Sequence, residues 1–130
     1  MKGVVIKSTG SWFNVRTDDG FVIRCKLKGN FRTKGLKTTN PLAVGDKVEF
    51  DYRDEEKVGL INKILPRYNY IIRKSTKLSK VSHIIAANID LALLVVTIRE
   101  PRTSVGFIDR FLVTAEAYHI PAALVFNKID

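Results

Sequence analysis

Cysteine is nearly absent from this sequence, which has a single residue of this type, Cys25, among its 130 residues. One thiol forms no disulfide within the chain, and no cysteine and histidine cluster has the spacing of a metal site. The chain also lacks a run of 18 apolar residues, which a membrane-spanning helix needs. Its start, Met1-Lys2-Gly3-Val4-Val5-Ile6, lacks the long apolar segment of a secretory signal. These absences predict a protein of the reducing cytoplasm with no membrane partner.

Acidic residues are scarce over the first two thirds of the sequence. Residues 1–70 hold 14 Lys and Arg against 8 Asp and Glu, and residues 71–88 hold four basic residues and no acidic one. Residues 89–130 hold four basic and five acidic residues, so the net charge of +9 belongs to the N-terminal part. This asymmetry favours a polyanion as the partner of that part over a basic surface that serves solubility alone.

A helical period is missing from the first 70 residues, which alternate as strands do. Residues 21–28 have an apolar face and a face that carries Arg24, Lys26 and Lys28. Further strands are predicted over residues 2–8, 12–17, 48–52 and 58–64, with a short last one over 68–72, and Asp18-Asp19-Gly20 is typical of a hairpin turn. We predict a five-stranded OB-fold β-barrel for residues 1–70, which Trp12 and Phe13 cap or fill. An SH3-like barrel is the alternative.

The composition changes after residues 71–88, which we predict to be a polar, basic connector. Residues 91–96 are apolar without alternation, as in a strand buried on both faces of a parallel sheet. Residues 105–119 follow a helical period with Thr103 or Ser104 as the N-cap, and residues 122–126 are a second apolar strand. Strand, helix and strand of these lengths predict a right-handed βαβ unit. Residues 89–130 are therefore assigned to the start of an α/β domain.

The second of these strands runs directly into Asn127-Lys128-Ile129-Asp130. Ligands of open α/β sheets bind beyond the carboxyl ends of the strands, which is where this segment is expected. The Asp130 carboxylate can accept hydrogen bonds from both N1–H and the 2-amino group of guanine, whereas adenine offers neither donor. The Lys128 stem can cover a face of the base, and the Asn127 amide can donate and accept. The pattern predicts guanine binding, the alternative being a polar turn.

A second candidate site is the stretch of residues 21–44, which contains no acidic residue. Six basic residues lie in it around Phe31, namely Arg24, Lys26, Lys28, Arg32, Lys34 and Lys37. Basic side chains beside an exposed aromatic ring suit RNA, through phosphate pairing and base stacking. The alternative is a solvated loop with Phe31 in the barrel core. We favour RNA binding.

Three segments occur in an order that is informative: residues 85–90 (IAANID), 108–112 (IDRFL) and 125–130 (VFNKID). They resemble successive signatures of the ribosome small-subunit-dependent GTPase A family (RsgA/YjeQ), and residues 45–50 and 65–67 resemble barrel segments of that family. The resemblance covers essentially the whole chain. It implies an N-terminal OB-fold, a circularly permuted GTPase domain and a C-terminal zinc-binding region. The guanine-specificity motif of the family maps onto Asn127, Lys128 and Asp130.

The resemblance also implies a function. Members of that family are GTP hydrolases that use GTP/GDP with Mg²⁺. They are stimulated by the 30S ribosomal subunit with its 16S rRNA, and they assist late maturation of that subunit. The parent of this chain is expected to be such an enzyme and to be monomeric. A non-catalytic OB-fold module that binds RNA or the ribosome is the alternative.

No phosphate-binding loop accompanies the guanine motif. None of the eight glycines begins a Gly-x-x-x-x-Gly-Lys-Ser/Thr sequence, which precedes the guanine motif in the usual GTPase order. The loop therefore follows residue 130, as permutation implies, or does not exist. We expect the phosphate loop, the magnesium and zinc ligands and the switch segments to lie outside this chain. The chain alone, with no catalytic residue, is predicted to be inactive and able to self-associate through its incomplete α/β part.

Overall fold

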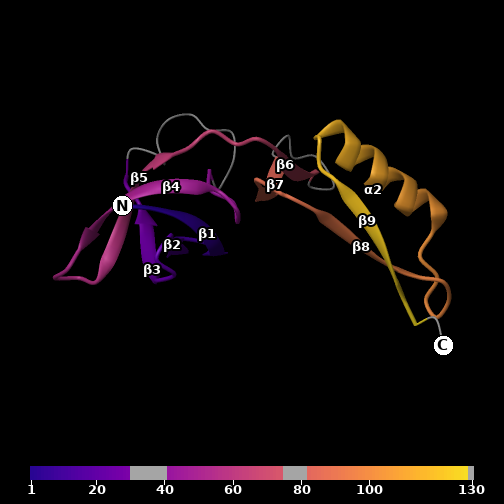
Figure 1. Ribbon diagram of the computed structural model, residues 1–130, viewed down its shortest axis with the longest axis horizontal. Helices are drawn as coiled ribbons and strands as arrows, with labels where there is room; N and C mark the ends of the chain where they lie inside the picture. Colours follow the sequence, from indigo (N-terminus) through magenta and orange to yellow (C-terminus); the bar gives the residue numbers. More distant parts are fainter. Residues whose placement is uncertain (30–40, 75–81, 129–130) are drawn as a thin grey trace. The chain divides into compact units, whose positions relative to one another are not determined.

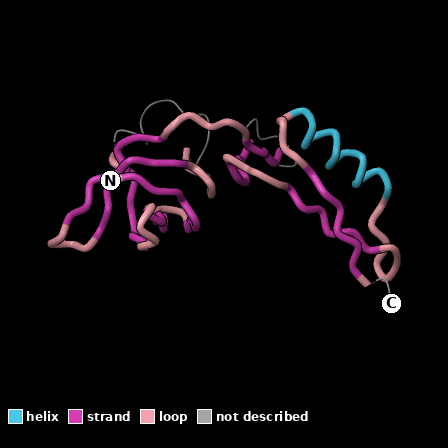
Figure 2. The backbone as a smooth tube through the Cα atoms, viewed as in Figure 1, coloured by secondary structure: helices cyan, strands magenta, loops and turns pink. Residues whose placement is uncertain are grey.

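Figure 1 shows the computed structural model of the chain, in which residues 1–29, 41–74 and 82–128 are described. The chain divides into two compact units, Met1–Asn88 and Ile89–Asp130. The described residues of the first unit form strands and loops, and helix α2 (Val105–Ala117) lies in the second unit (Figure 2).

The first unit is built on a closed barrel with the strand order β1-β2-β3-β5-β4. Its strands are β1 (Lys2–Thr9), β2 (Trp12–Thr17), β3 (Val22–Leu27), β4 (Lys47–Arg53) and β5 (Val58–Ile64). Neighbouring strands are antiparallel, except that β3 runs parallel to β5, and β4 closes the barrel on β1. This is the topology of the OB-fold and not of an SH3-like barrel, so the predicted fold is confirmed.

Alternation along the strands decides which side chains fill the barrel. The inward side chains are at most 1 % exposed and include Val5, Phe13, Val15, Cys25, Val48, Phe50 and Ile61. Phe13 fills the core as expected. Trp12 does not, because adjacent residues of a strand point to opposite faces, and its ring lies against basic side chains instead. Burial raises the pKa of the Cys25 thiol to about 11, so this thiol remains protonated at neutral pH.

A two-stranded antiparallel sheet completes the first unit. It pairs β6 (Tyr70–Lys74) with β7 (Ser82–Ala87). The sequence predicted a short strand over residues 68–72 but not β7, because residues 84–87 are apolar without alternation. The end of β7 contacts the barrel, where the Ala87 N–H donates to the carbonyl oxygen of Val44 at 2.8 Å. The barrel and this hairpin are therefore joined through backbone hydrogen bonding.

The second unit has the predicted order of strand, helix and strand. Its elements are β8 (Ala92–Thr97), α2 (Val105–Ala117) and β9 (Ala122–Asn127). β8 and β9 are parallel, and α2 lies along one face of their sheet (Figure 1). Ser104 is the N-cap of α2, since its Oγ accepts a hydrogen bond from the Phe107 N–H at 3.1 Å. In the described part of the chain, no helix combines the length and apolar character required to span a bilayer.

One face of the β8–β9 sheet remains open to solvent. Leu94 and Val96, on the covered face, are 9 % and 4 % exposed, whereas Leu93 and Val95 on the other face are 58 % and 59 % exposed. The apolar run of β8 predicted burial on both faces. A single helix covers only one face of two strands, so the other face has no covering layer among the described residues of the second unit itself.

Candidate functional site

The guanine motif begins at the carboxyl end of β9. Asn127 is the last residue of β9 and lies in register with Thr97, the last residue of β8. Both strands therefore end at the same edge of the sheet, where ligands bind in open α/β sheets. Ile129 and Asp130, which complete the motif, lie outside the described residues. The recognition of guanine by Asp130 consequently stays a prediction.

The loop between β8 and α2 is folded against the start of this motif. The Thr97 N–H donates to Thr103 Oγ1 at 2.9 Å, and the Thr103 N–H donates back to the Thr97 carbonyl oxygen at 2.8 Å. The ammonium of Lys128 donates to the carbonyl oxygen of Glu100 at 3.1 Å. Lys128 is thus tethered to the loop while its side chain remains exposed to solvent. Thr97, Glu100 and Thr103 shape this edge, and no sequence motif marked them.

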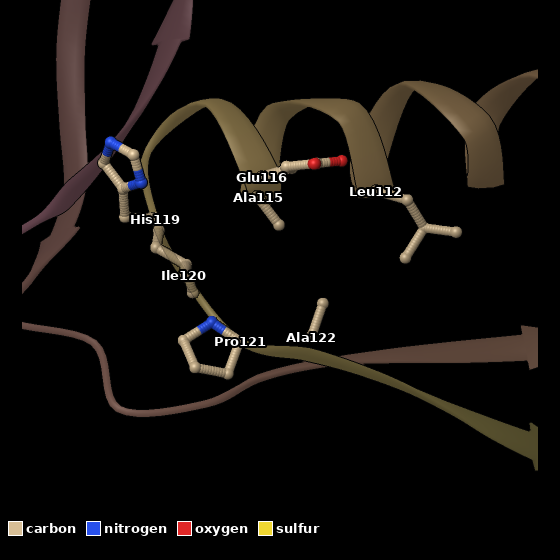
Figure 3. Close-up of a pocket in the computed structure, with 7 residues that line it drawn as sticks. All are labelled: Leu112, Ala115, Glu116, His119, Ile120, Pro121 and Ala122. Carbon is tan, nitrogen blue, oxygen red and sulfur yellow. The ribbon is translucent and has the colours of Figure 1, made fainter.

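A hollow in the second unit lies at the opposite end of β9 from Asn127. It has a volume of about 440 Å³ and lies between the end of α2 and the start of β9 (Figure 3). Its lining residues are Leu112, Ala115, Glu116, His119, Ile120, Pro121 and Ala122. A strand rises about 3.3 Å per residue, so the length of β9 separates this hollow from Asn127. It is therefore not the site that the guanine motif marks.

The outer face of β2 and β3 carries part of the predicted RNA surface. Arg24 and Lys26 are exposed on β3, and Lys28 follows the strand and is exposed as well. The ion pairs among the described residues join Glu49 to Lys2 and Asp46 to Arg67, and no carboxylate of these residues is paired with Arg24 or Lys26. Arg32, Lys34 and Lys37, the other candidates, lie outside the described residues.

An aromatic ring lies between these cations and the barrel. The Arg24 Cζ atom is 3.7 Å from the centroid of the Trp12 ring, and the Lys26 Nζ atom is 4.3 Å from it. Both distances fall within the range of cation–π attraction. In OB-folds the face formed by strands 2 and 3 binds oligonucleotides. The sequence marked the cations of this face but missed Trp12, whose outward direction follows from that of its buried neighbour Phe13.

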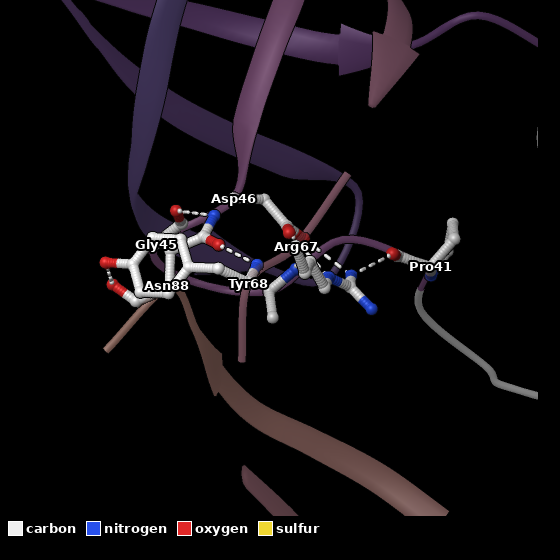
Figure 4. A network of polar contacts seen from close by, with 7 residues as sticks. Pro41, Gly45, Asp46, Arg67, Tyr68 and Asn88 are labelled. Atoms are coloured by element: carbon white, nitrogen blue, oxygen red, sulfur yellow. Dashed lines mark hydrogen bonds and ion pairs between the residues drawn. The ribbon is translucent and has the colours of Figure 1, made fainter. Parts of the chain in front are cut away.

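A buried ion pair holds the loop before β4 against the segment after β5 (Figure 4). The Asp46 carboxylate is fully buried and accepts hydrogen bonds from Arg67 Nε and Nη2 at 2.6 Å each and from the Ala43 N–H at 2.8 Å. Arg67 Nη2 also donates to the Pro41 carbonyl oxygen at 2.9 Å. The hydrogen bonds to Asp46 raise the pKa of the Arg67 guanidinium above its ordinary value. The pair is thus fully hydrogen-bonded and structural in character.

Asn88, the last residue of the first unit, extends this network (Figure 4). Its Nδ2 donates to the Gly45 carbonyl oxygen at 3.0 Å, and its Oδ1 accepts from the Tyr68 N–H at 3.0 Å. The Tyr68 hydroxyl donates to the Asn88 carbonyl oxygen at 2.7 Å. The end of the first unit is therefore fixed on the barrel loop by side-chain and backbone hydrogen bonds together.

An OB barrel followed by a strand–helix–strand unit that runs into a guanine motif, with no phosphate loop ahead of it, is the arrangement of a circularly permuted GTPase. The family model described as the RsgA N-terminal domain matches residues 2–61, and the one described as the RsgA GTPase matches residues 64–130. The chain belongs to the RsgA family, as the sequence motifs predicted.

Known relatives agree with this assignment. A small ribosomal subunit biogenesis GTPase, RsgA 2 of Bacteroides thetaiotaomicron, is 60 % identical over 130 residues, which are 100 % of this chain and 42 % of the relative. The RsgA of Christiangramia forsetii is 58 % identical over 132 residues, and the match covers 100 % of this chain and 42 % of the relative. The chain therefore spans about 42 % of the length of these relatives.

Two solved structures share the fold. YjeQ from Thermotoga maritima matches with a TM-score of 0.72 at 36 % identity, and the match covers 99 % of this chain and 41 % of that one. YloQ, a circularly permuted GTPase, matches with a TM-score of 0.71 at 31 % identity and the same coverage. The barrel and the strand–helix–strand unit thus both occur in structures of this family.

Proposed function

We propose that this chain forms the RNA-binding barrel and the guanine-recognising segment of a GTPase that acts in biogenesis of the small ribosomal subunit. The position of Asn127 carries the proposal, because it ends a parallel strand at the edge where nucleotides bind and begins an Asn-Lys-x-Asp motif. Family membership supports an enzyme over the alternative of a non-catalytic RNA-binding module.

In this proposal the base is recognised by three side chains with different tasks. Asp130 accepts hydrogen bonds from the two guanine donors at once, so adenine would leave a desolvated carboxylate without partners. The aliphatic stem of Lys128 covers a face of the base, and its tether to Glu100 limits how far that stem can move. Asn127 supplies an amide that can bond the base edge or the neighbouring loop.

The proposal extends to GTP and GDP with Mg²⁺ as ligands, to 16S rRNA in the 30S subunit as the partner of the barrel, and to the cytoplasm as location. A monomeric parent and a zinc-binding region outside this chain follow from the family resemblance alone. Within residues 1–29, 41–74 and 82–128, no group of three or more His, Cys, Asp or Glu could hold a metal ion.

We expect no GTP hydrolysis by the isolated 130-residue chain. Phosphoryl transfer depends on a phosphate cradle, Mg²⁺ and a positioned water, and a guanine contact supplies none of these. The measurement is phosphate release by the purified chain, with and without small ribosomal subunits. Turnover that co-purifies with the chain through successive columns and disappears on heat unfolding would contradict this expectation.

Asp130→Asn should change the nucleotide preference from GTP towards xanthosine triphosphate. The new amide can still accept from N1–H, its NH₂ can donate to the xanthine oxygen, and the same NH₂ repels the guanine amine. We expect the ratio of the two affinities to shift about tenfold or more, which corresponds to about 1.4 kcal/mol or more.

This experiment uses the Bacteroides thetaiotaomicron relative, with its matching region replaced by this chain. Competition binding of the two nucleotides measures the ratio directly. Glu116→Gln, at an exposed position of α2, removes a carboxylate elsewhere in the same unit and serves as the control. An unchanged ratio in the Asp130 variant would remove Asp130 from guanine recognition, whereas equal loss of both nucleotides would indicate damage to the fold.

A further inference from the structure

Trp12 is the single tryptophan of the chain, and it lies half-buried on the outer face of β2. It is not part of the barrel core, which its neighbour Phe13 helps to fill. Instead the ring has the Arg24 guanidinium 3.7 Å and the Lys26 ammonium 4.3 Å from its centroid. One ring thus holds two like charges that lie two residues apart on β3.

Within the described ranges, these cations have no carboxylate counterion. Strands β2 and β3 contain no acidic residue, and no carboxylate of the described residues pairs with either cation. Two cations drawn to one ring repel each other, and a bound anion would relieve that repulsion. The N–H donors of the Arg24 guanidinium lie in its plane, so contact of the guanidinium with the ring leaves donors for a phosphate.

The same arrangement disfavours base stacking on Trp12. A guanidinium 3.7 Å from the ring centroid occupies the position that a stacked base would take. A base that stacked on the face of the ring held by Arg24 would displace Arg24 and lose the cation–π attraction, which is worth about 0.5–2 kcal/mol. The ring is therefore placed to hold cations rather than to bind bases.

We propose that Trp12 is a positioning residue that holds Arg24 and Lys26 as a two-cation site for the backbone phosphates of folded RNA. The inference rests on the proposed RNA-binding function of the barrel and goes beyond it by specifying phosphates as the ligand and Trp12 as the residue that orders the site. Ordering two long side chains before binding lowers the entropy cost of contact with RNA.

A double-mutant cycle on the whole chain tests whether Trp12 acts through Arg24. Binding of a fully paired RNA hairpin is measured for wild type, Trp12→Leu, Arg24→Ala and the double variant. We expect each single change to weaken binding about threefold to tenfold. In the Arg24→Ala background, Trp12→Leu should cost less than about twofold, because the cation that the ring positions is already gone. Trp12→Phe keeps a ring and should stay within about twofold of wild type.

Intrinsic fluorescence gives an independent measurement, since all tryptophan emission comes from this position. A base stacked on the ring quenches that emission, whereas a phosphate held by the cations leaves most of it. We therefore expect little quenching by the paired hairpin, and weaker binding of an unstructured oligouridylate of the same length. Strong quenching by the oligouridylate together with additive losses in the cycle would overturn the proposal in favour of base stacking.

The triple variant Arg24→Ala, Lys26→Ala, Lys28→Ala distinguishes failure of the Trp12 proposal from failure of the proposed RNA binding by the barrel. If the basic face binds RNA, the triple variant loses affinity for every RNA and its salt dependence becomes shallower. An unchanged affinity and salt dependence would show that RNA binds elsewhere, and both proposals would fall. A loss in the triple variant with additive Trp12 and Arg24 effects would leave the RNA-binding face intact and remove only the role of Trp12.

Discussion

Replacing Arg67 with methionine should destabilise the first unit by about 3–5 kcal/mol, because it leaves a buried carboxylate without its charged partner. Asp46 is fully buried, and two of its three hydrogen bonds come from the Arg67 guanidinium at 2.6 Å each. The remaining bond, from the Ala43 N–H, satisfies only one carboxylate oxygen. A desolvated charge of this kind costs far more than the pair itself contributes.

Two matched variants make this prediction specific. The double change Asp46→Asn with Arg67→Met removes both charges while keeping an oxygen for the Ala43 N–H, so it should recover a substantial part of the lost stability. Lys2→Met breaks the exposed pair with Glu49, whose atoms are 3.6 Å apart, and should cost less than about 1 kcal/mol. Urea unfolding followed by Trp12 fluorescence measures all three variants. Equal effects of the Arg67 and Lys2 changes would show that burial of Asp46 carries no such penalty.

The parts of the fold that sequence predicted are those with a local repeating pattern. The segments of β3 and β4 alternate between apolar and polar residues over five or more positions, and the α2 segment has a helical period, so these elements could be placed from their own residues. β7 could not be placed this way because its residues 84–87 are apolar on both sides. Its pairing with β6 depends on a partner several residues distant in sequence.

The Asp46–Arg67 pair shows a second limit of predicting structure from sequence. The two residues lie 21 positions apart, and nothing near either one indicates the other. Resemblance to the family marked residues 45–50 and 65–67 as related segments but did not connect them. The structure brings them together because β4 and β5 are antiparallel neighbours, so the residue before β4 and a residue after β5 come to one end of the barrel.

At the candidate sites, the sequence predicted which chemical groups are present but not which residues contact one another. The order of strand and motif placed Asn127 at the edge of the sheet, since the carboxyl ends of parallel strands lie together. The hydrogen bond from Lys128 to Glu100 depends on how a loop folds, and no periodic pattern in the sequence predicts that. On the barrel, alternation identified Arg24 and Lys26 as outward, but the ring beneath them belongs to another strand.

Gly45→Ala should be among the most damaging single-methyl changes in the chain. A Cβ at this position would lie 1.9 Å from the Ala87 carbonyl oxygen and 3.0 Å from its carbonyl carbon, and both atoms belong to backbone. The φ angle of +96° adds strain, because side chains other than glycine rarely adopt it. Relief requires the barrel loop and the end of β7 to separate, with loss of the hydrogen bonds that Val44 and Gly45 make to Ala87 and Asn88.

Gly20→Ala separates backbone strain from steric overlap as causes of destabilisation. Gly20 has a similar φ of +90°, but a Cβ there would meet no atom within 4 Å beyond its chain neighbours. Backbone strain alone costs about 1–3 kcal/mol, and this part should be common to both variants. We expect Gly45→Ala to be less stable than Gly20→Ala by at least about 2 kcal/mol in urea unfolding. Hydrogen exchange at the Ala87 amide should also accelerate in the Gly45 variant only, because that amide bonds to Val44 across the contact. Equal stability of the two variants would mean that the barrel loop and β7 part at little cost, and that the polar network around Asn88 does not hold the end of the first unit in place.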